Sequence, residues 1–237
     1  MGSPFLSRAQ LLLGDEGMAR LAAARVLLVG IGGVGSWCAE GLVRSGIRQL
    51  TIVDCDRVAP SNVNRQLMAT SKTVGQLKVE ALKEHLLEVA PDAEITALPE
   101  RYTAESALDF EAYDVVVDAI DSLKDKGALL VQASAASRPR LYSSMGAALK
   151  IDPRRVRVAE FWDVRGCPLG SALRKKLRRA GTLPSRPIRC VFSDELRENR
   201  GSQDEIAGNV NGSLLPITGI FGFTLAGLIL QDLIDGE

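Results

Sequence analysis

The sequence predicts an α/β fold: a Rossmann-like, doubly wound and mainly parallel sheet that antiparallel strands extend in the C-terminal half. An apolar run without alternation occurs at residues 26–29, and residues 50–53 and 113–118 are further strand candidates rich in β-branched residues, as expected for parallel strands covered by helices on both faces. Helical stretches separate these runs, and a cluster of glycines directly follows the first one. We expect residues 1–237 to form one domain with a basic helical insertion near residues 165–190.

The first half of the chain alternates helices and strands. Residues 7–24 form a helical lead-in with a glycine break, and a helix over residues 36–45 stops at Gly46, a natural left-handed end. Apolar residues at helical spacing predict a helix over residues 74–90. Residues 95–98 are the next strand candidate.

The second half departs from this alternation. A helix over residues 124–137 leads to a strand at 140–145, and residues 155–159 alternate in polarity, which predicts an antiparallel addition to the sheet. Residues 206–231 carry no charge and are long enough to span a membrane. The proline and glycines within that stretch favour a buried helix, packed under the sheet or at a dimer seam. A membrane is therefore not expected.

The glycine cluster predicts a nucleotide site. Gly30, Gly32 and Gly35 have the G-x-G-x-x-G spacing, with Gly33 between them. In such a turn the missing Cβ atoms allow a tight bend, a close approach of backbone N–H groups to phosphate, and close packing of helix on strand. The N-terminus of the following helix favours the same anion. A glycine-rich turn without a ligand is the alternative.

Polar side chains follow the second strand, at the sheet edge where ligands bind in this fold. Asp54 lies about twenty residues after the last glycine, where an acid contacts ribose hydroxyls and repels a 2′-phosphate. Asp56, Asn62, Arg65 and Gln66 crowd the loop that follows, and such side chains bind polyphosphate through charge-assisted hydrogen bonds. An ordinary polar turn is the alternative reading of this loop.

Three further charged residues point to the same pocket. Lys78 lies near the start of the next predicted helix, from which it can reach the pocket, although an isolated lysine is more often solvated. Asp118 and Asp121 end the strand at 113–118, and two carboxylates there suit Mg²⁺ shared with phosphate oxygens. Asp121 is the preferred ligand, and the alternative is that one of the pair caps a helix.

Charge is balanced overall but not locally. Lys plus Arg and Asp plus Glu both number 29, so no global field recruits nucleic acid or a membrane. Every charged residue between Asp163 and Asp194 is basic, however, which predicts a local surface for an anionic partner such as RNA. A solvated basic face is the alternative. The residues expected to contact RNA are Arg174, Lys175, Lys176, Arg178 and Arg179.

The cysteines indicate the compartment. Cys38, Cys55, Cys167 and Cys190 are scattered, with no C-x-x-C pair and no secretory signal peptide. We expect a reducing, cytoplasmic protein without structural zinc.

The chain resembles the E1-like adenylyltransferases over nearly its whole length. Five motifs in order carry the resemblance: the glycines, the acid after the second strand, the Asn-Arg-Gln loop, the lysine and the Asp-x-x-Asp motif. That family includes activators of ubiquitin and of sulfur-carrier proteins. The resemblance implies that the glycine turn and Asp54 hold the adenosine half of ATP, and that Asp121 holds Mg²⁺. The residues it assigns to the phosphates are Asn62, Arg65, Gln66 and Lys78.

The resemblance is strongest to the tRNA threonylcarbamoyladenosine dehydratase branch, through residues 29–37 and 117–122, and through residues 151–153 with the basic helix that follows, 190–193 and 221–223. It implies ATP-dependent cyclisation of the threonylcarbamoyl group (t6A) of a tRNA, with tRNA and not DNA as the partner. An arginine of the N-terminal segment acts in the partner subunit's site in this family, which implies a homodimer with Arg8 acting in trans. A sulfur-transfer or desulfurase partner is also conceivable. The segment between Arg179 and Cys190 is shorter than in longer members of the branch.

Two other functions stay open at this point. The chain could adenylate a ubiquitin-like sulfur-carrier protein, although the two C-x-x-C pairs usual in such activators are absent. It could instead be a non-catalytic or NAD-dependent nucleotide-binding protein.

Overall fold

The computed structural model describes residues 4–201 and 211–236, and the first part of the uncharged stretch, residues 206–210, lies outside them. A mixed sheet forms the centre, in the strand order β3-β2-β1-β4-β5-β7-β6. Its strands are β1 (Arg25–Val29), β2 (Gln49–Val53), β3 (Glu94–Leu98), β4 (Val115–Asp118), β5 (Arg140–Ser144), β6 (Val156–Glu160) and β7 (Arg189–Ser193). The α-helices are α1 (Ser7–Ala23), α2 (Gly35–Ser45), α3 (Lys78–Val89), α4 (Leu123–Ala135), α5 (Pro168–Ala180) and α6 (Leu215–Asp235).

Short 3-10 helices connect several of these elements. They are η1 (Pro4–Leu6), η2 (Pro60–Asn62), η3 (Phe110–Ala112), η4 (Pro153–Arg155) and η5 (Phe161–Asp163).

The predicted doubly wound topology is confirmed. The chain runs outward from β1 through β2 to β3, returns to the other side of β1, and continues through β4 and β5, all parallel. The antiparallel extension is the β6–β7 pair, in which β7 itself is parallel to β5. Because the chain reverses its winding direction between β1 and β4, a crevice forms at the carboxyl ends of these strands.

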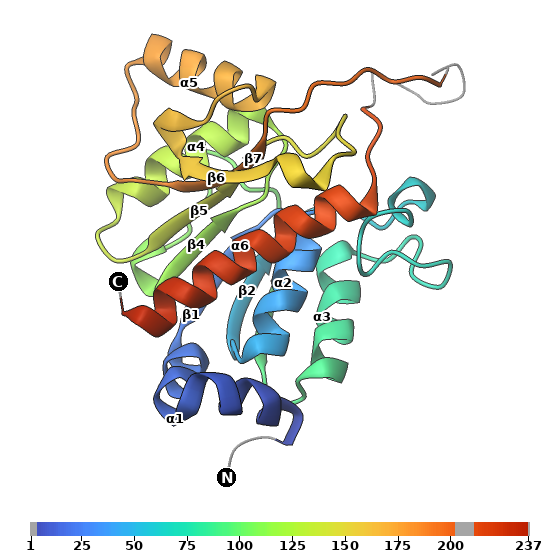
Figure 1. The fold of residues 1–237 in the computed structure, drawn as a ribbon, viewed down its shortest axis with the longest axis vertical. Coiled ribbons are helices and arrows are strands. Elements are labelled where there is room, and N and C mark those ends of the chain that lie inside the picture. The colour runs from blue at the N-terminus through green and yellow to red at the C-terminus, as the bar shows by residue number, and fades with distance from the viewer. Residues whose placement is uncertain (1–3, 202–210, 237) are drawn as a thin grey trace.

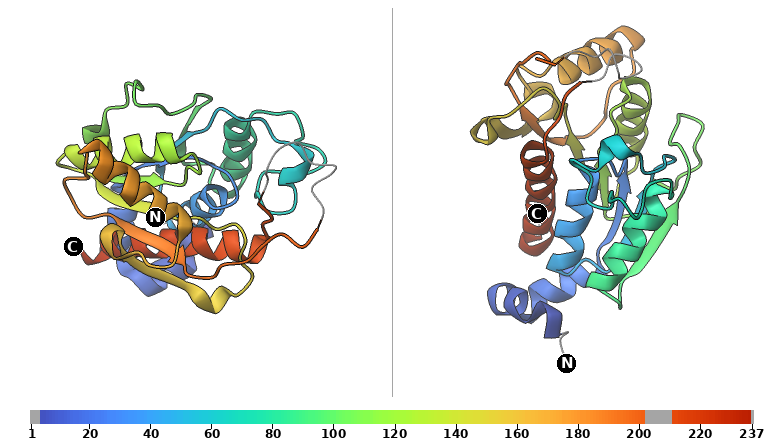
Figure 2. Two further views of the ribbon diagram at one scale, coloured as in Figure 1. Left: turned by 90° about the horizontal axis from the view of Figure 1, so that it is seen from above. Right: turned by 90° about the vertical axis from the view of Figure 1, so that its right-hand side faces the viewer.

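The two faces of the sheet have separate cores. Alternate residues such as Val26 and Leu28 of β1 pack with α2, α3 and α6, whereas Leu27 and Val29 pack on the opposite face with α4 and α5. Figure 1 shows α6 crossing the sheet in front of α2, and Figure 2 shows the layers from two further sides. Strands buried on both faces explain the continuous apolar runs of the sequence.

Helices α2 and α6 pack unusually closely. A Cβ added at Gly222 would lie 2.6 Å from the carbonyl oxygen of Val34, and one at Gly41 would lie 2.9 Å from the Cβ of Ala226. The close packing predicted for the uncharged stretch is therefore confirmed for α6. By length and mean hydropathy (1.7) α6 could also cross a membrane, but 44% of that apolar window is buried within the fold. The expectation of no membrane contact stays a prediction.

Two details differ from the sequence expectations. Strand β7 was not predicted, because its five residues begin with Arg189 inside the basic stretch. Helix α3 begins at Lys78 and not at residue 74, because Leu77 forms a β-bridge with Arg57. The predicted glycine break in the lead-in helix is confirmed, since α1 departs from helical geometry at Gly14, where φ is 68°. All four cysteines are free thiols, of which Cys55 is exposed and the other three are buried. The cytoplasmic location stays a prediction.

Candidate active site

A cleft of about 780 Å³ lies at the carboxyl edge of the sheet. Its lining residues come directly after the parallel strands: Gly30 follows β1, Asp54 follows β2, Ala119 follows β4 and Met145 follows β5. The chain order of the strands thus gathers residues far apart in sequence at one edge.

The glycine turn brings the start of α2 to this cleft. Gly30 has φ 87°, and a Cβ there would lie 2.7 Å from the carbonyl oxygen of Ala119, so only glycine fits. Gly30, Gly32 and Gly33 line the cleft, but Gly35 does not. A Cβ at Gly35 would lie 1.9 Å from the carbonyl oxygen of Gly30. The missing side chain of Gly35 therefore lets the start of α2 pack against the turn after β1, and its assignment as a nucleotide contact stays a prediction.

An acidic turn and a buried lysine form the adjoining wall. The Asp54 carboxylate accepts the backbone N–H of Ile31 (3.0 Å) and that of Asp56 (2.9 Å), which ties the glycine turn to the end of β2. The Nζ of Lys78 lies 2.6 Å from Oδ2 of Asp56, and the Lys78 side chain is largely buried. Asp54, Asp56 and Lys78 all line the cleft, so this wall presents a fixed ammonium group with one exposed counter-ion.

The loop that carries Arg65 is held by the first residues of α2. The indole Nε1 of Trp37 donates to the carbonyl oxygen of Arg65 at 2.9 Å, and Oγ of Ser36 accepts the N–H of Leu67 at 3.2 Å. The guanidinium of Arg65 donates to the carbonyl oxygen of Ser61 (2.8 Å). Arg65 therefore lines the cleft on a backbone that is fixed relative to the glycine turn.

Asn62 and Gln66 also line the cleft, with different partners. Asn62 Oδ1 accepts the N–H of Ala59 at 3.0 Å and so shapes the loop. Among the described residues, Gln66 Oε1 is the buried side-chain atom without a hydrogen-bond partner. An unsatisfied buried acceptor costs about 1–3 kcal/mol. The site therefore lacks a donor at this point, which a nucleotide hydroxyl or a cation-bound water can supply.

The two carboxylates of the Asp-x-x-Asp motif have different environments. Asp121 is exposed and lines the cleft. Asp118 is buried, where its Oδ2 lies 2.5 Å from Nζ of the fully buried Lys126 and accepts the hydroxyl of Ser143 at 2.6 Å. Burial raises the pKa of Asp118, and the Lys126 ammonium opposes that rise. Asp118 is thus a structural residue, which corrects its interpretation as a possible metal ligand.

The donor set fits Mg²⁺ only together with a phosphate. Mg²⁺ usually binds one or two carboxylates, substrate phosphates and waters. Asp121 offers one such carboxylate, and Gln66 Oε1 offers an acceptor for a bound water. The group of metal-capable side chains found among the described residues, Asp54, Cys55 and Asp56, does not include Asp121. Asp121 would hold the ion through the nucleotide and not as part of a closed protein cage.

The basic stretch divides into exposed and structural cations. Helix α5 buries Leu173 and Leu177 and exposes Lys175, Lys176 and Arg179. The other two cations of α5, Arg174 and Arg178, contact partners within the chain. Arg174 donates to the carbonyl oxygen of Phe161 (3.1 Å), and the guanidinium of Arg178 lies 4.9 Å from the ring centroid of Trp162.

The cations that follow α5 have other roles. Arg186 donates to the carbonyl oxygens of Ser134, Ser137 and Pro139, and Arg189 pairs with Asp232. The predicted basic insertion near residues 165–190 thus contains one helix, α5, and its last two cations are held by partners within the chain. The exposed cations of the stretch lie on α5 and at Arg165 before it.

Arg8 lies far from the cleft of its own chain. It is exposed on α1, and Figure 1 shows α1 at the opposite end of the molecule from α5. The end of α2 remote from the glycine turn, Gly46, contacts α1 through Met18. Arg8 cannot join the other site residues within one chain, so its predicted role in trans stays a prediction.

Sequence reasoning missed several lining residues. Arg101 and Asp125 form an ion pair of 2.6 Å in the cleft wall, and the small residues after β5 line the far side. The buried partner of Asp118, Lys126, was also missed, although the sequence indicates it by placing a lysine in an apolar helix eight residues after Asp118. The small residues carry no such signal.

The fold and this cleft define a nucleotide-binding protein of the E1-like class, and residues 6–235 match the ThiF family model, so the chain belongs to the ThiF family. It is 37% identical to tRNA threonylcarbamoyladenosine dehydratase of Bacillus subtilis (strain 168), over 94% of this chain and 90% of that protein. It is 31% identical to the protein of the same name from Haemophilus influenzae, over 92% and 89%. The crystal structure of E. coli tRNA N6-threonylcarbamoyladenosine dehydratase, TcdA, in complex with ATP superposes with a TM-score of 0.87, at 30% identity over 98% of this chain and 94% of that one.

Proposed function

We propose that this protein is an ATP-dependent tRNA threonylcarbamoyladenosine dehydratase. The observation that carries the proposal is the cleft, in which Arg65, Lys78 and Asp121 converge from three different elements beside the glycine turn. The similarity to dehydratases over nearly the whole chain, and to one crystallised with ATP, supports ATP as the nucleotide and a modified tRNA as the substrate.

The proposed reaction turns a carboxylate into a leaving group. A carboxylate oxygen of the threonylcarbamoyl group attacks the α-phosphorus of ATP, the bond to the β-phosphate oxygen breaks, and pyrophosphate leaves. The neighbouring carbamoyl group then attacks the acyl carbon, loses a proton and expels AMP with the carboxylate oxygen. Ring closure within one molecule can have an effective molarity of about 10⁵ M or more, so the protein need not supply a nucleophile.

The chain's residues position charge in this reaction. Arg65 and Lys78 face the phosphates and stabilise the negative charge that develops at the α-phosphate and on pyrophosphate. Asp54 binds the ribose hydroxyls at the end of β2. Mg²⁺, held by Asp121 when bound, neutralises part of the phosphate charge. We further propose a homodimer in which Arg8 reaches the second subunit's site, because α1 lies at the opposite end of the molecule from α5, whose first turn lines the cleft.

The direct test is mass spectrometry of tRNA carrying t6A after incubation with the protein, ATP and Mg²⁺. Loss of one water from the modified nucleoside, with AMP and pyrophosphate as co-products, is the expected result. Pyrophosphate exchange that depends on a ubiquitin-like carrier protein and not on this tRNA would select the sulfur-carrier function instead. Binding of NAD in preference to ATP would select the non-catalytic or NAD-dependent function.

The exposed cations of α5 should bind the tRNA backbone. Reversing charge at Lys176 and Arg179 removes two contacts and adds repulsion, so we expect tRNA affinity to fall at least about tenfold and its salt dependence to flatten. Filter binding at several salt concentrations measures both. Lys83→Glu, on α3 across the sheet, is the control and should leave affinity unchanged. Equal tRNA affinity of the α5 variant and the wild type would show that α5 is a solvated basic face and not a tRNA contact.

A further inference from the structure

The nucleotide residues account for only one side of the cleft. The strand order places β5 two strands away from β1, so residues that follow β5 lie about 10 Å from the glycine turn. None of the lining residues on that side carries a charge. We call this set the acceptor wall: Ser144, Met145, Gly146, Ala147, Ala148 and Leu169.

We propose that the acceptor wall forms the subsite for the target nucleoside of the tRNA and its threonylcarbamoyl group. This inference rests on the proposed function and adds to it the place where the acceptor binds. An ionised group loses solvation in an apolar, uncharged pocket unless it finds a partner there. The carboxylate therefore turns toward Arg65 and Lys78, while the neutral ureido and base portions lie against the wall. An uncharged wall thus orients the carboxylate toward the α-phosphate.

The wall ends in a strained residue. Leu149 has φ 58°, and among the described residues it is the non-glycine residue in the left-handed region. Such a conformation costs roughly 1–2 kcal/mol for a residue with a Cβ, and strained residues cluster at functional sites because the surrounding structure must enforce them. The N–H of Leu149 donates to the carbonyl oxygen of Gly212 at 2.9 Å. The segment before α6 therefore fixes the wall from one side.

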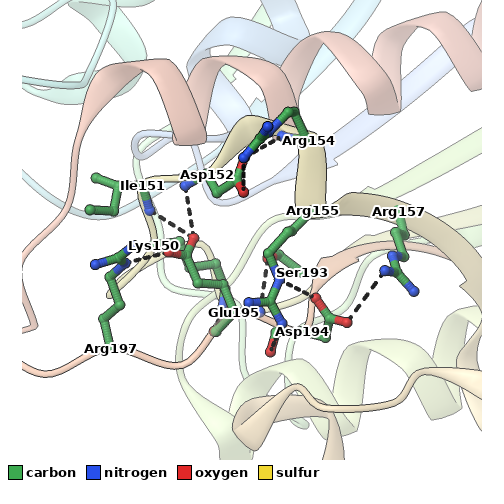
Figure 3. A network of polar contacts seen from close by, with 10 residues as sticks. All are labelled: Lys150, Ile151, Asp152, Arg154, Arg155, Arg157, Ser193, Asp194, Glu195 and Arg197. Atoms are coloured by element: carbon green, nitrogen blue, oxygen red, sulfur yellow. Dashed lines mark hydrogen bonds and ion pairs between the residues drawn. The ribbon is translucent and has the colours of Figure 1, made fainter.

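A buried polar network fixes the wall from the other side. Figure 3 shows Glu195 receiving the backbone N–H groups of Ile151 and Asp152, each at 2.8 Å, while Nζ of Lys150 donates to the Glu195 carbonyl oxygen at 2.6 Å. Lys150 and Glu195 are both nearly inaccessible. The donors around the carboxylate lower the pKa of Glu195 to about 2, so it stays ionised in the working range. None of these charged groups lines the cleft, which leaves its acceptor side neutral.

Helix α5 connects the acceptor wall to the exposed cations. Leu169 lies in the first turn of α5, and Gly146 packs against it, since a Cβ at Gly146 would lie 3.5 Å from the Cβ of Leu169. Lys176 and Arg179 follow on the same helix, about 10–15 Å further along at 1.5 Å per residue. A nucleoside seated beside Leu169 therefore leaves the phosphates of neighbouring nucleotides within reach of α5.

The test fills the acceptor side without touching the nucleotide side. Ala148 is half-buried and lines the cleft, so Ala148→Leu should obstruct the nucleoside. We expect kcat/KM for tRNA carrying t6A to fall at least tenfold, while the affinity for ATP·Mg²⁺, measured by calorimetry, stays within twofold of wild type. Ala135→Leu makes the same change at the exposed end of α4 and should alter neither quantity.

Each outcome of this experiment either supports or overturns the proposed acceptor subsite. If wild type does not dehydrate the tRNA, the proposed function fails and the acceptor subsite fails with it. If wild type is active and Ala148→Leu keeps its kcat/KM, the function stands and the subsite is wrong. An equal loss of ATP affinity in this variant would assign the wall to the nucleotide and also overturn the inference. Should Ala148→Leu lower Tm, Gly146→Ala carries the same test, because its methyl would meet only ordinary contacts.

Discussion

Replacing Arg65 with alanine is expected to lower ATP-dependent turnover by at least about a hundredfold, the usual effect of removing one preorganised donor from a developing charge. The side chain lines the cleft beside the glycine turn, on a loop whose backbone Trp37 and Ser36 hold in place. Because those contacts involve the backbone and not the guanidinium, the substitution should leave the loop and the Tm unchanged. Steady-state release of pyrophosphate with tRNA carrying t6A measures the effect.

Arg57→Ala is the matched control for this variant. Arg57 is an exposed arginine nearby whose guanidinium donates to the carbonyl oxygen of Gly75 at 2.8 Å, and it does not line the cleft. Its loss should change turnover less than about twofold. Full activity of Arg65→Ala, or an equal loss in both variants, would show that Arg65 does not act on the phosphates.

The position of the site could be predicted because it depends on local sequence signals. An apolar run that breaks into Gly30-Ile-Gly-Gly-Val-Gly35 specifies strand, turn and helix, and Asp54 ends the next strand. Parallel strands place their carboxyl ends at one edge, so residues following them must meet. The convergence of Arg65, Lys78 and Asp121 follows from this rule without any knowledge of side-chain contacts.

Burial and long-range partners could not be predicted in the same way. The sequence favours Asp121 over Asp118 as a ligand but does not show the partners of either, because only the orientation of α4 relative to β5 gives Asp118 two buried partners. Arg186 and the exposed cations of α5 likewise belong to one basic stretch, yet backbone carbonyls of the α4–β5 connection hold Arg186. The sign of a charge is visible in the sequence, but its partner is not.

The acceptor wall shows a different limit. Its residues after β5 are mostly small and uncharged, so none of them has the chemical signature that motif reasoning detects. Their significance comes from their position in the cleft and from the strain at Leu149. Neutral subsites are therefore recognised from the fold and not from composition.

Lys126→Met should be the most destabilising of the substitutions considered, at about 3–5 kcal/mol, because breaking a buried pair leaves an uncompensated charge. Lys126 is fully buried, and its Nζ lies 2.5 Å from Asp118 Oδ2 beneath the loop that carries Asp121. Urea unfolding at pH 7 measures the loss. Arg154→Met is the control, since Arg154 pairs with Asp152 but its side chain is 87% exposed, and its removal should cost less than about 1 kcal/mol.

The pH dependence separates a stranded charge from a lost packing contact. Without Lys126, only the hydrogen bonds from Ser143 and the Ile120 N–H oppose the effect of burial on Asp118, so its folded-state pKa rises further above the unfolded value of about 3.9. A carboxyl whose pKa is raised in the folded state binds a proton more tightly there than in the unfolded chain. The folded state therefore gains stability as pH falls, and the deficit of the variant should shrink between pH 7 and pH 5. Asp118→Asn combined with Lys126→Met should recover part of the loss at pH 7. A deficit that is constant with pH and unchanged in the double variant would mean that Lys126 contributes by its volume, and that the charge pair does not hold the Asp121 loop.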